Sequence, residues 1–186
     1  MKHLKTLGLF VMAAAALMAF AGSASAATFT APSGTEYTGS MDATLEGSAL
    51  LKAGFAEDTC TVSTVSGNLT TNNETEASGS TNGVAFSGCS ITTHTISNTG
   101  TLKINKSNTQ VSGTGVEVTV AAFGISCVYG MGAGTTLGTA KNTGSGVTLV
   151  ISAKLPRISG NSFLCGNPAE WTANYFATTP SSSVVD

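Results

Sequence analysis

Apolar and polar residues alternate with a two-residue period along much of this chain, and this pattern constrains the fold most. It is clearest in Val147–Leu155. There one side would carry Val147, Leu149, Ile151, Ala153 and Leu155, the other Thr148, Ser152 and Lys154, and only Val150 breaks the pattern. A two-residue period is typical of a half-buried β-strand. We therefore predict a strand over Val147–Leu155.

The same alternation predicts further strands, among them Leu102–Ile104, Val116–Val120, Ile125–Tyr129 and Trp171–Tyr175. In the third of these, Cys127 should point into the core. Weaker patterns predict strands near Tyr37–Leu45, Ala49–Phe55, Thr59–Leu69 and Gly83–Thr95. The segment Thr70–Asn82 is almost entirely small and polar, so we expect an exposed loop there. After residue 30 the chain shows no apolar stripe at helical spacing.

Composition distinguishes a folded β protein from a disordered polar chain. The chain is 41% hydrophobic and only 10% charged, whereas disorder usually accompanies few apolar residues and high charge. Many short strands separated by Gly, Asn and Ser indicate an all-β domain. We expect an antiparallel β-sandwich, because two packed sheets offer disulfides a natural place to bridge. A jelly roll or another barrel-like fold is the alternative.

The N-terminal segment resembles a bacterial secretory signal peptide. It has a basic start at residues 2–5, the apolar run Leu7–Phe20, and the small-x-small site Ala24-Ser25-Ala26. The run is shorter than the ~20 residues that a membrane-spanning helix needs. We expect a signal helix at residues 1–26 and one secreted domain at 27–186, extracellular or in the cell envelope (periplasmic if the host has an outer membrane), with no membrane insertion after cleavage.

The charge of the exported part excludes some partners. The chain has eight Lys and Arg and ten Asp and Glu, and the signal segment contains two of the lysines, Lys2 and Lys5. The exported part therefore has a net charge of −4. Six scattered cations do not form the basic stripe that a nucleic acid requires.

Four cysteines, Cys60, Cys89, Cys127 and Cys165, lie in the exported part. In an oxidising compartment an even number predicts disulfides, and four cysteines allow three pairings. We favour Cys60–Cys89 and Cys127–Cys165, because each pair joins near neighbours in sequence; loops of about 30–40 residues stabilise by roughly 3–4 kcal/mol each. Thiolate metal sites usually contain close C-x-x-C pairs, which are missing here. We predict no metal and no other cofactor.

Catalytic signals are weak, and we predict no catalytic residue. His94 is the only histidine after the signal segment and belongs to a predicted strand end, where a solvated side chain is expected. The acid pairs Glu57-Asp58 and Glu74/Glu76 lack the fixed facing geometry that glycoside hydrolysis needs. The glycine-rich stretch 130–136 is not followed by a helix start, so we interpret it as a hairpin or loop rather than a phosphate-binding loop.

Trp171, Tyr175 and Phe176 form the main aromatic group. The first two share one strand face and Phe176 takes the other, so one side of this strand would carry a ring outward. An outward ring suggests a sugar-stacking or protein-binding surface, and core packing is the alternative.

Several motifs of the second half resemble a group of small secreted four-cysteine bacterial proteins of unknown function. They are Ser126-Cys127-Val128-Tyr129-Gly130, Ala153-Lys154-Leu155-Pro156-Arg157, Ser162-Phe163-Leu164-Cys165-Gly166 and Glu170-Trp171-Thr172-Ala173-Asn174-Tyr175. The layout is more distantly similar to the exported family labelled as activator of alkane oxidation. The resemblance implies an all-β scaffold and the Cys127–Cys165 pairing, and it implies no functional residue.

Together these observations favour a non-enzymatic secreted protein with a structural, adhesive or envelope-associated role. Its expected partners are cell-envelope components or further copies of itself, paired through strand edges. The alternative is a carbohydrate- or ligand-binding module that uses the aromatic group at Trp171. A small secreted hydrolase is the third candidate.

Overall fold

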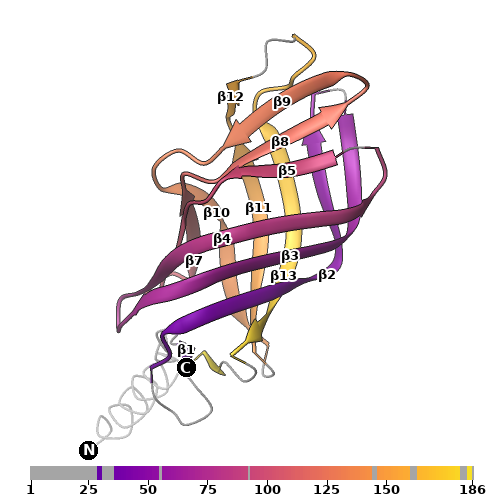
Figure 1. Ribbon diagram of the computed structural model, residues 1–186. Coiled ribbons are helices and arrows are strands. Elements are labelled where there is room, and N and C mark those ends of the chain that lie inside the picture. The colour runs from indigo at the N-terminus through magenta and orange to yellow at the C-terminus, as the bar shows by residue number, and fades with distance from the viewer. Residues whose placement is uncertain are drawn as a thin grey trace, which may run out of the picture.

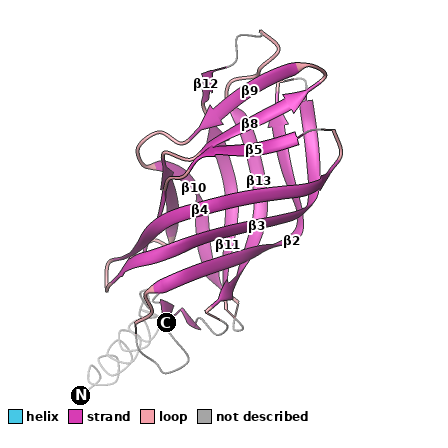
Figure 2. Cartoon of the chain, viewed as in Figure 1, coloured by secondary structure: helices cyan, strands magenta, loops and turns pink. Residues whose placement is uncertain are grey.

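The structure, a computed structural model, describes residues 29–30, 36–54, 56–91, 93–143, 146–159, 163–180 and 184–185. In these ranges the regular structure consists of strands alone (Figure 2). The strands are β1 (Phe29–Thr30), β2 (Gly39–Ala53), β3 (Ala56–Asn72), β4 (Glu76–Cys89), β5 (Thr93–Asn98), β6 (Thr101–Asn105), β7 (Gln110–Thr114), β8 (Glu117–Ala122), β9 (Ile125–Gly130), β10 (Thr135–Asn142), β11 (Val147–Leu155), β12 (Arg157–Ser159), β13 (Ala169–Thr179) and β14 (Val184–Val185). The described part contains no helix suited by length and hydropathy to cross a membrane. The expected signal helix lies outside the described residues.

Eight antiparallel strands form a closed barrel, in the order β10-β11-β13-β2-β3-β4-β6-β7 (Figure 1). The ring closes because β7 pairs with β10, with Gly113 opposite Thr135 and Gln110 opposite Thr139. Each barrel strand therefore has a hydrogen-bonded neighbour on both sides. One set of side chains points inward, since successive residues of a strand face opposite ways.

A second sheet, in the order β12-β9-β8-β5, lies against one end of the barrel, and we call it the cover sheet (Figure 1). The barrel requires this cover because its strands differ in length. Strands β2, β3 and β4 have 15, 17 and 14 residues, whereas β6 and β7 have five each. Of the 14 residues of β4, only Glu76–Ser80 pair with β6. The parts of β2, β3 and β4 that extend beyond β6 and β7 are covered by the apolar inner side of β8 and β9, which includes Val118, Val120 and Cys127.

Strand β2 contains an irregular segment that bends it around the barrel. Its register with β3 shifts between Thr44 and Ala49. Within this segment Gly47 has φ of 81°, a conformation that residues with a Cβ rarely adopt. Bulges of this kind raise local twist and allow a long strand to serve two packed layers.

The fold confirms the all-β prediction but differs from the expected sandwich. The larger sheet is a closed ring, so the barrel-like alternative describes it better. The physical reason is the pairing of β7 with β10, which joins segments about 25 residues apart. Inward and outward alternation is the same in a sandwich and in a barrel, and the sequence pattern alone does not distinguish them.

The predicted exposed loop over Thr70–Asn82 was wrong. Strands β3 and β4 run through it and leave only residues 73–75 as the turn. Ala77 is buried in the barrel, and the buried Thr81 hydroxyl donates to the carbonyl of Gly100 at 2.9 Å. Small Thr and Ser residues suit an extended backbone, and the neighbouring strands supply the hydrogen bonds that a polar loop would have sought from water.

Several predicted strands are confirmed. Strand β11 spans Val147–Leu155 as expected, and its inward residues include Val147, Ile151 and Ala153. Cys127 points into the core, as its position in the alternation predicted. The two predicted strands at Tyr37–Leu45 and Ala49–Phe55 form one long strand, β2, over Gly39–Ala53.

Both favoured disulfides are present. Cys60 and Cys89 are register partners on β3 and β4, with Cα atoms 3.9 Å apart. Cys127 on β9 is joined to Cys165, which lies in the segment before β13. The first bridge therefore lies within the barrel sheet, whereas the second connects the cover sheet to the chain entering the barrel.

Replacing Cys127 and Cys165 together by alanine should loosen the cover sheet selectively. The lost cross-link costs about 4 kcal/mol by the chain-entropy argument. Hydrogen exchange should show residues 117–130 losing protection well before β11 and β13. The matched variant without Cys60 and Cys89 should lower overall stability and leave the order of exchange unchanged. Uniform loss of protection in the first variant would contradict this assignment.

Candidate functional site

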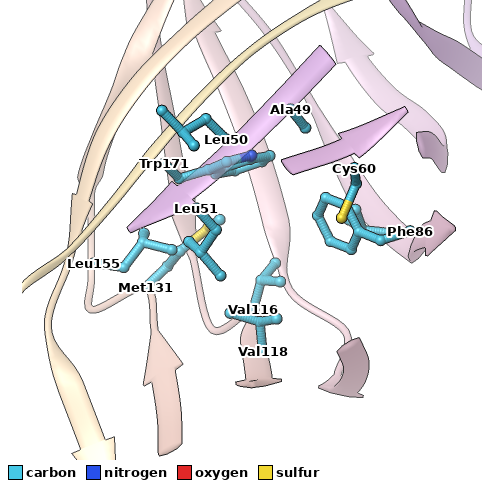
Figure 3. Close-up of a pocket in the computed structure, with 11 residues that line it drawn as sticks. Ala49, Leu50, Leu51, Cys60, Phe86, Val116, Val118, Met131, Leu155 and Trp171 are labelled. Carbon is cyan, nitrogen blue, oxygen red and sulfur yellow. The ribbon is translucent and has the colours of Figure 1, made fainter. Parts of the chain in front are cut away.

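The candidate site is the barrel interior, which holds three small cavities. The first measures about 30 Å³ and lies between the barrel strands and the start of β8 (Figure 3). It is lined by Ala49, Leu50, Leu51, Cys60, Val84, Phe86, Val116, Val118, Met131, Leu155 and Trp171. Among these side chains only the Trp171 indole carries a nitrogen or oxygen atom. The first cavity is therefore an apolar space with a single polar group in its wall.

The other two cavities continue this space along the barrel. One of about 20 Å³ shares Val84, Val116 and Trp171 with the first. The last, of about 90 Å³, shares Val65 and Val111 with the second and extends to Met41, Ala43 and Ala177. The three cavities thus follow one another from the cover sheet toward the opposite end. The Thr81 and Tyr175 hydroxyl groups belong to the wall of the second cavity, and further polar side chains such as Ser66 and Asn68 line the last.

Small inward residues leave this space open. Alanine is the most frequent residue among the buried hydrophobic positions of the described chain. Ala43 on β2 and Ala177 on β13 are register partners, and both line the cavity of about 90 Å³, the largest of these three. An eight-stranded barrel is just wide enough for its side chains to fill it or for one small ligand. With methyl groups at these positions, side chains alone do not fill this barrel.

The aromatic group has a different arrangement from the outward surface considered above. Trp171 and Tyr175 are buried, with exposed fractions of 8% and 1%. Their rings meet edge to face at 6.0 Å, and Phe86 meets Trp171 in the same way at 6.4 Å. Phe176 does take the other face of β13, where it is half-buried. The two larger rings of the group therefore face the barrel interior and not the solvent.

Two buried polar atoms in the described chain have no hydrogen-bond partner: Trp171 Nε1 and Tyr129 Oη. The Trp171 indole lies among the residues that line the first cavity (Figure 3). Burial raises the pKa of Tyr129, with the charge of Arg157 acting against this. In contrast, the Tyr175 hydroxyl shares a hydrogen bond of 2.9 Å with Ser63 Oγ.

The acidic pairs do not form facing carboxylates. Glu57 and Asp58 point to opposite sides of β3: Glu57 is exposed and pairs with Lys52 at 3.3 Å, while Asp58 is buried. The Asp58 carboxylate accepts hydrogen bonds from Ser90 N, Ser90 Oγ and Ile91 N at 2.7–3.0 Å. It lies beside Cys60 and Cys89, whose sulfur atoms are bonded to each other and are not free to ligate a metal. Asp58 thus fixes the chain after β4.

A polar cavity of about 430 Å³ lies at the turns that follow β3 and β6. Glu74 and Glu76 both line it, but Glu76 is paired with Lys103, which lowers the pKa of Glu76. The buried Lys106 donates to Asn72 Oδ1 at 2.8 Å, and burial lowers the pKa of Lys106, with Glu36 acting against this. Glu76 and Lys103 pair with each other, and Lys106 is bonded to Asn72. This cavity is therefore a weaker candidate for a ligand site than the barrel interior.

Most of the remaining predicted features lie apart from the barrel interior. His94 belongs to β5, where its backbone is opposite Val120. Residues 131–134 of the glycine-rich stretch connect β9 to β10, which confirms the loop interpretation. Within this stretch Met131 lines the first two cavities, whereas its glycines are absent from the three cavity walls.

No protein family, curated protein or solved structure matches the chain in the three comparisons made. The assignment of a site therefore depends on its geometry. On that basis the apolar interior beside Trp171 is the strongest candidate.

The alternation of apolar and polar residues did not indicate the cavities. The available signal was alanine at inward positions of the predicted strands, for example Ala153 and Ala173. Alternation shows that these residues share a face. It does not show that the facing strands also contribute small residues, and this is what leaves a space.

Tyr175→Phe should lower the free energy of unfolding by about 1–2 kcal/mol near neutral pH, because Ser63 loses its buried partner. Burial raises the pKa of Tyr175 from 10.0 to about 12. The neutral hydroxyl therefore favours the folded state below pH 10, and this contribution of about 3 kcal/mol disappears as the pH rises from 10 to 12. Urea unfolding followed by Trp171 fluorescence at pH 7 and pH 11 measures both effects.

The variant should lose less stability than the parent protein between these two pH values. At pH 7, Tyr129→Phe serves as the matched control, because it removes a buried hydroxyl without a partner. An equal alkaline loss in the parent protein and in Tyr175→Phe would contradict the assignment to Tyr175.

Proposed function

We propose that this protein is a secreted, non-enzymatic binding protein that holds a small apolar molecule inside its barrel. The observation that carries this proposal is the series of three adjoining cavities with largely apolar walls. Empty space in a core loses the dispersion contacts that packed atoms would make. A molecule that restores these contacts is stabilised there, and the barrel gains stability in return.

The size of the space limits the ligand. The cavities measure about 90, 30 and 20 Å³. A ligand that spans all three would occupy about 140 Å³, close to the ~150 Å³ at which an apolar protein cavity stays dry and binds a molecule of benzene size. The ligand is therefore one small ring or a short alkyl chain, and a sugar is too polar for these walls.

The proposed location is outside the cytoplasm. The signal-like segment at residues 1–26 supports export, and the two disulfides are consistent with an oxidising compartment. We place the protein in the extracellular space or the cell envelope, where a carrier of poorly soluble molecules has a use. Cell-envelope partners remain a prediction.

Other functions have less support from the geometry. Stacking on sugars needs exposed rings, whereas Trp171 and Tyr175 are buried. Edge-to-edge assembly needs open strand edges, and ring closure pairs each of eight strands on both sides over at least part of its length. In the described chain the open edges include those of β5 and β12 in the cover sheet, of the two-residue strands β1 and β14, and of the part of β4 after Thr81, so self-association would have to use such segments.

Toluene binding tests the proposal. The oxidised secreted protein should bind toluene with saturation, seen as a change in Trp171 fluorescence and as a rise in the thermal midpoint. Because Trp171 is the only tryptophan of the chain, the fluorescence comes from the cavity wall. Absence of binding near the solubility limit of toluene would contradict the proposal.

Ala177→Leu should weaken toluene binding at least tenfold, because three added carbon atoms enter the largest cavity. The matched control is Thr178→Leu at the next position, whose side chain is exposed. This control should bind toluene as the parent protein does. Equal affinity in both variants would locate the ligand elsewhere.

A further inference from the structure

The Trp171 indole N–H is a hydrogen-bond donor in an apolar wall. Trp171 is 92% buried, from its exposed fraction of 8%, and its Nε1 has no partner in the described structure. A buried donor without an acceptor destabilises the folded protein, and native structures seldom keep one without a reason. The position of this donor in the wall of a cavity supplies such a reason.

Water is a poor partner for this N–H. The first cavity has the volume for a water molecule, at about 30 Å³. A buried water, however, needs two to four polar partners. Apart from the indole nitrogen, the side chains in this wall present only carbon and sulfur. A single water would make one hydrogen bond and lose the others.

We propose that the molecule bound in the barrel is a neutral carbonyl compound, whose oxygen accepts a hydrogen bond from Trp171 Nε1 while its apolar body fills the cavities. This inference rests on the proposed function. A carbonyl oxygen only accepts, which matches a wall with one donor. A hydrocarbon leaves the N–H unpaired, and an alcohol brings an O–H donor that the lining side chains do not satisfy.

Charged ligands do not fit this wall. A carboxylate would need a cation or several donors to replace its hydration, and the lining of the first cavity has neither. An ammonium group would place one donor against another. The donor thus narrows the ligand class from apolar molecules in general to small neutral molecules with an acceptor oxygen and no donor, of which we propose a carbonyl compound.

The wall beside Trp171 can yield to a ligand. Leu51 is the register partner of Trp171 on the adjacent strand β2, and Leu50 precedes it. Both leucines are only half-buried, so their side chains have room to shift when a ligand oxygen approaches the nitrogen. Figure 3 shows the two leucine side chains around the indole. The other unpartnered atom, Tyr129 Oη, belongs to a residue outside the wall of these cavities and takes no part.

The test compares cyclohexanone with methylenecyclohexane, which has the same shape and no oxygen. The chain has one tryptophan, so its nitrogen-15 NMR spectrum contains one indole N–H signal. Cyclohexanone should move this signal downfield, as a hydrogen bond to oxygen does. Methylenecyclohexane should bind without that shift.

Trp171→Phe keeps an aromatic ring and removes the donor. The ratio of the two affinities, ketone to alkene, should fall about threefold to tenfold in this variant relative to the parent protein. The NMR shift in the parent protein decides the question even if the variant fails to fold.

Two negative results have different meanings. If both probes bind, the indole signal does not respond to the ketone and the affinity ratio is unchanged, the carbonyl assignment is overturned and apolar binding stands. If neither probe binds, the proposed function and this inference both fail.

Discussion

The pairing of β7 with β10 is the interaction on which the rest of this structure depends. It closes a ring of eight strands and turns one face of every strand into an interior. In an open sheet, the inward residues would pack on a second layer that could approach until the space was filled. In a closed ring the strand number sets the distance across the interior, so the walls cannot approach in the same way. The volume of the inward side chains then decides whether a space remains.

The cover sheet solves a problem that ring closure creates. Strands β2, β3 and β4 extend beyond the short strands β6 and β7, and their apolar inner faces would otherwise meet water. Residues of β8 and β9 cover them, and Val118 of β8 together with Met131, which follows β9, forms part of the wall of the first cavity. Strands β8 and β9 belong to the cover sheet, whereas β13 belongs to the barrel. The Cys127–Cys165 bridge joins the cover sheet to the chain that enters β13. The disulfide therefore supports the wall next to Trp171 as well as the fold.

The sequence predicted what depends on local pattern. The bounds of β11 and the inward direction of Cys127 follow from alternation, and both disulfides join near neighbours in the chain. Ring closure depends on the pairing of two short strands, β7 and β10, whose sequences alternate only weakly, and alternation does not show which strands pair. Thr70–Asn82 was misassigned for a related reason, because its Ser and Thr residues gain their strand partners only in the folded sheet.

The orientation of the Trp171 side chain is likewise a feature that the sequence pattern predicts only in part. Alternation placed Trp171 and Tyr175 on one face and Phe176 on the other, and the structure keeps that division. Which face is inside depends on the neighbours of β13, and these are β2 and β11. Reactive residue types did not indicate the site either, because it consists of apolar cavities and one indole N–H without a hydrogen-bond partner.

A core rich in alanine and an unpaired indole N–H both reduce stability, and the chain contains features that offset this. By the chain-entropy argument each disulfide restrains a loop of 29 or 38 residues and contributes roughly 3–4 kcal/mol. This contribution acts mainly on the unfolded chain and does not require a filled core. Cross-linking thus permits the barrel to keep space and an unused donor, both of which a tightly packed core of the same size would have removed. The bridges and the cavities are therefore two parts of one arrangement, in which cross-links in and beside the cavity wall supply stability without filling the space, and the site keeps its capacity for a ligand.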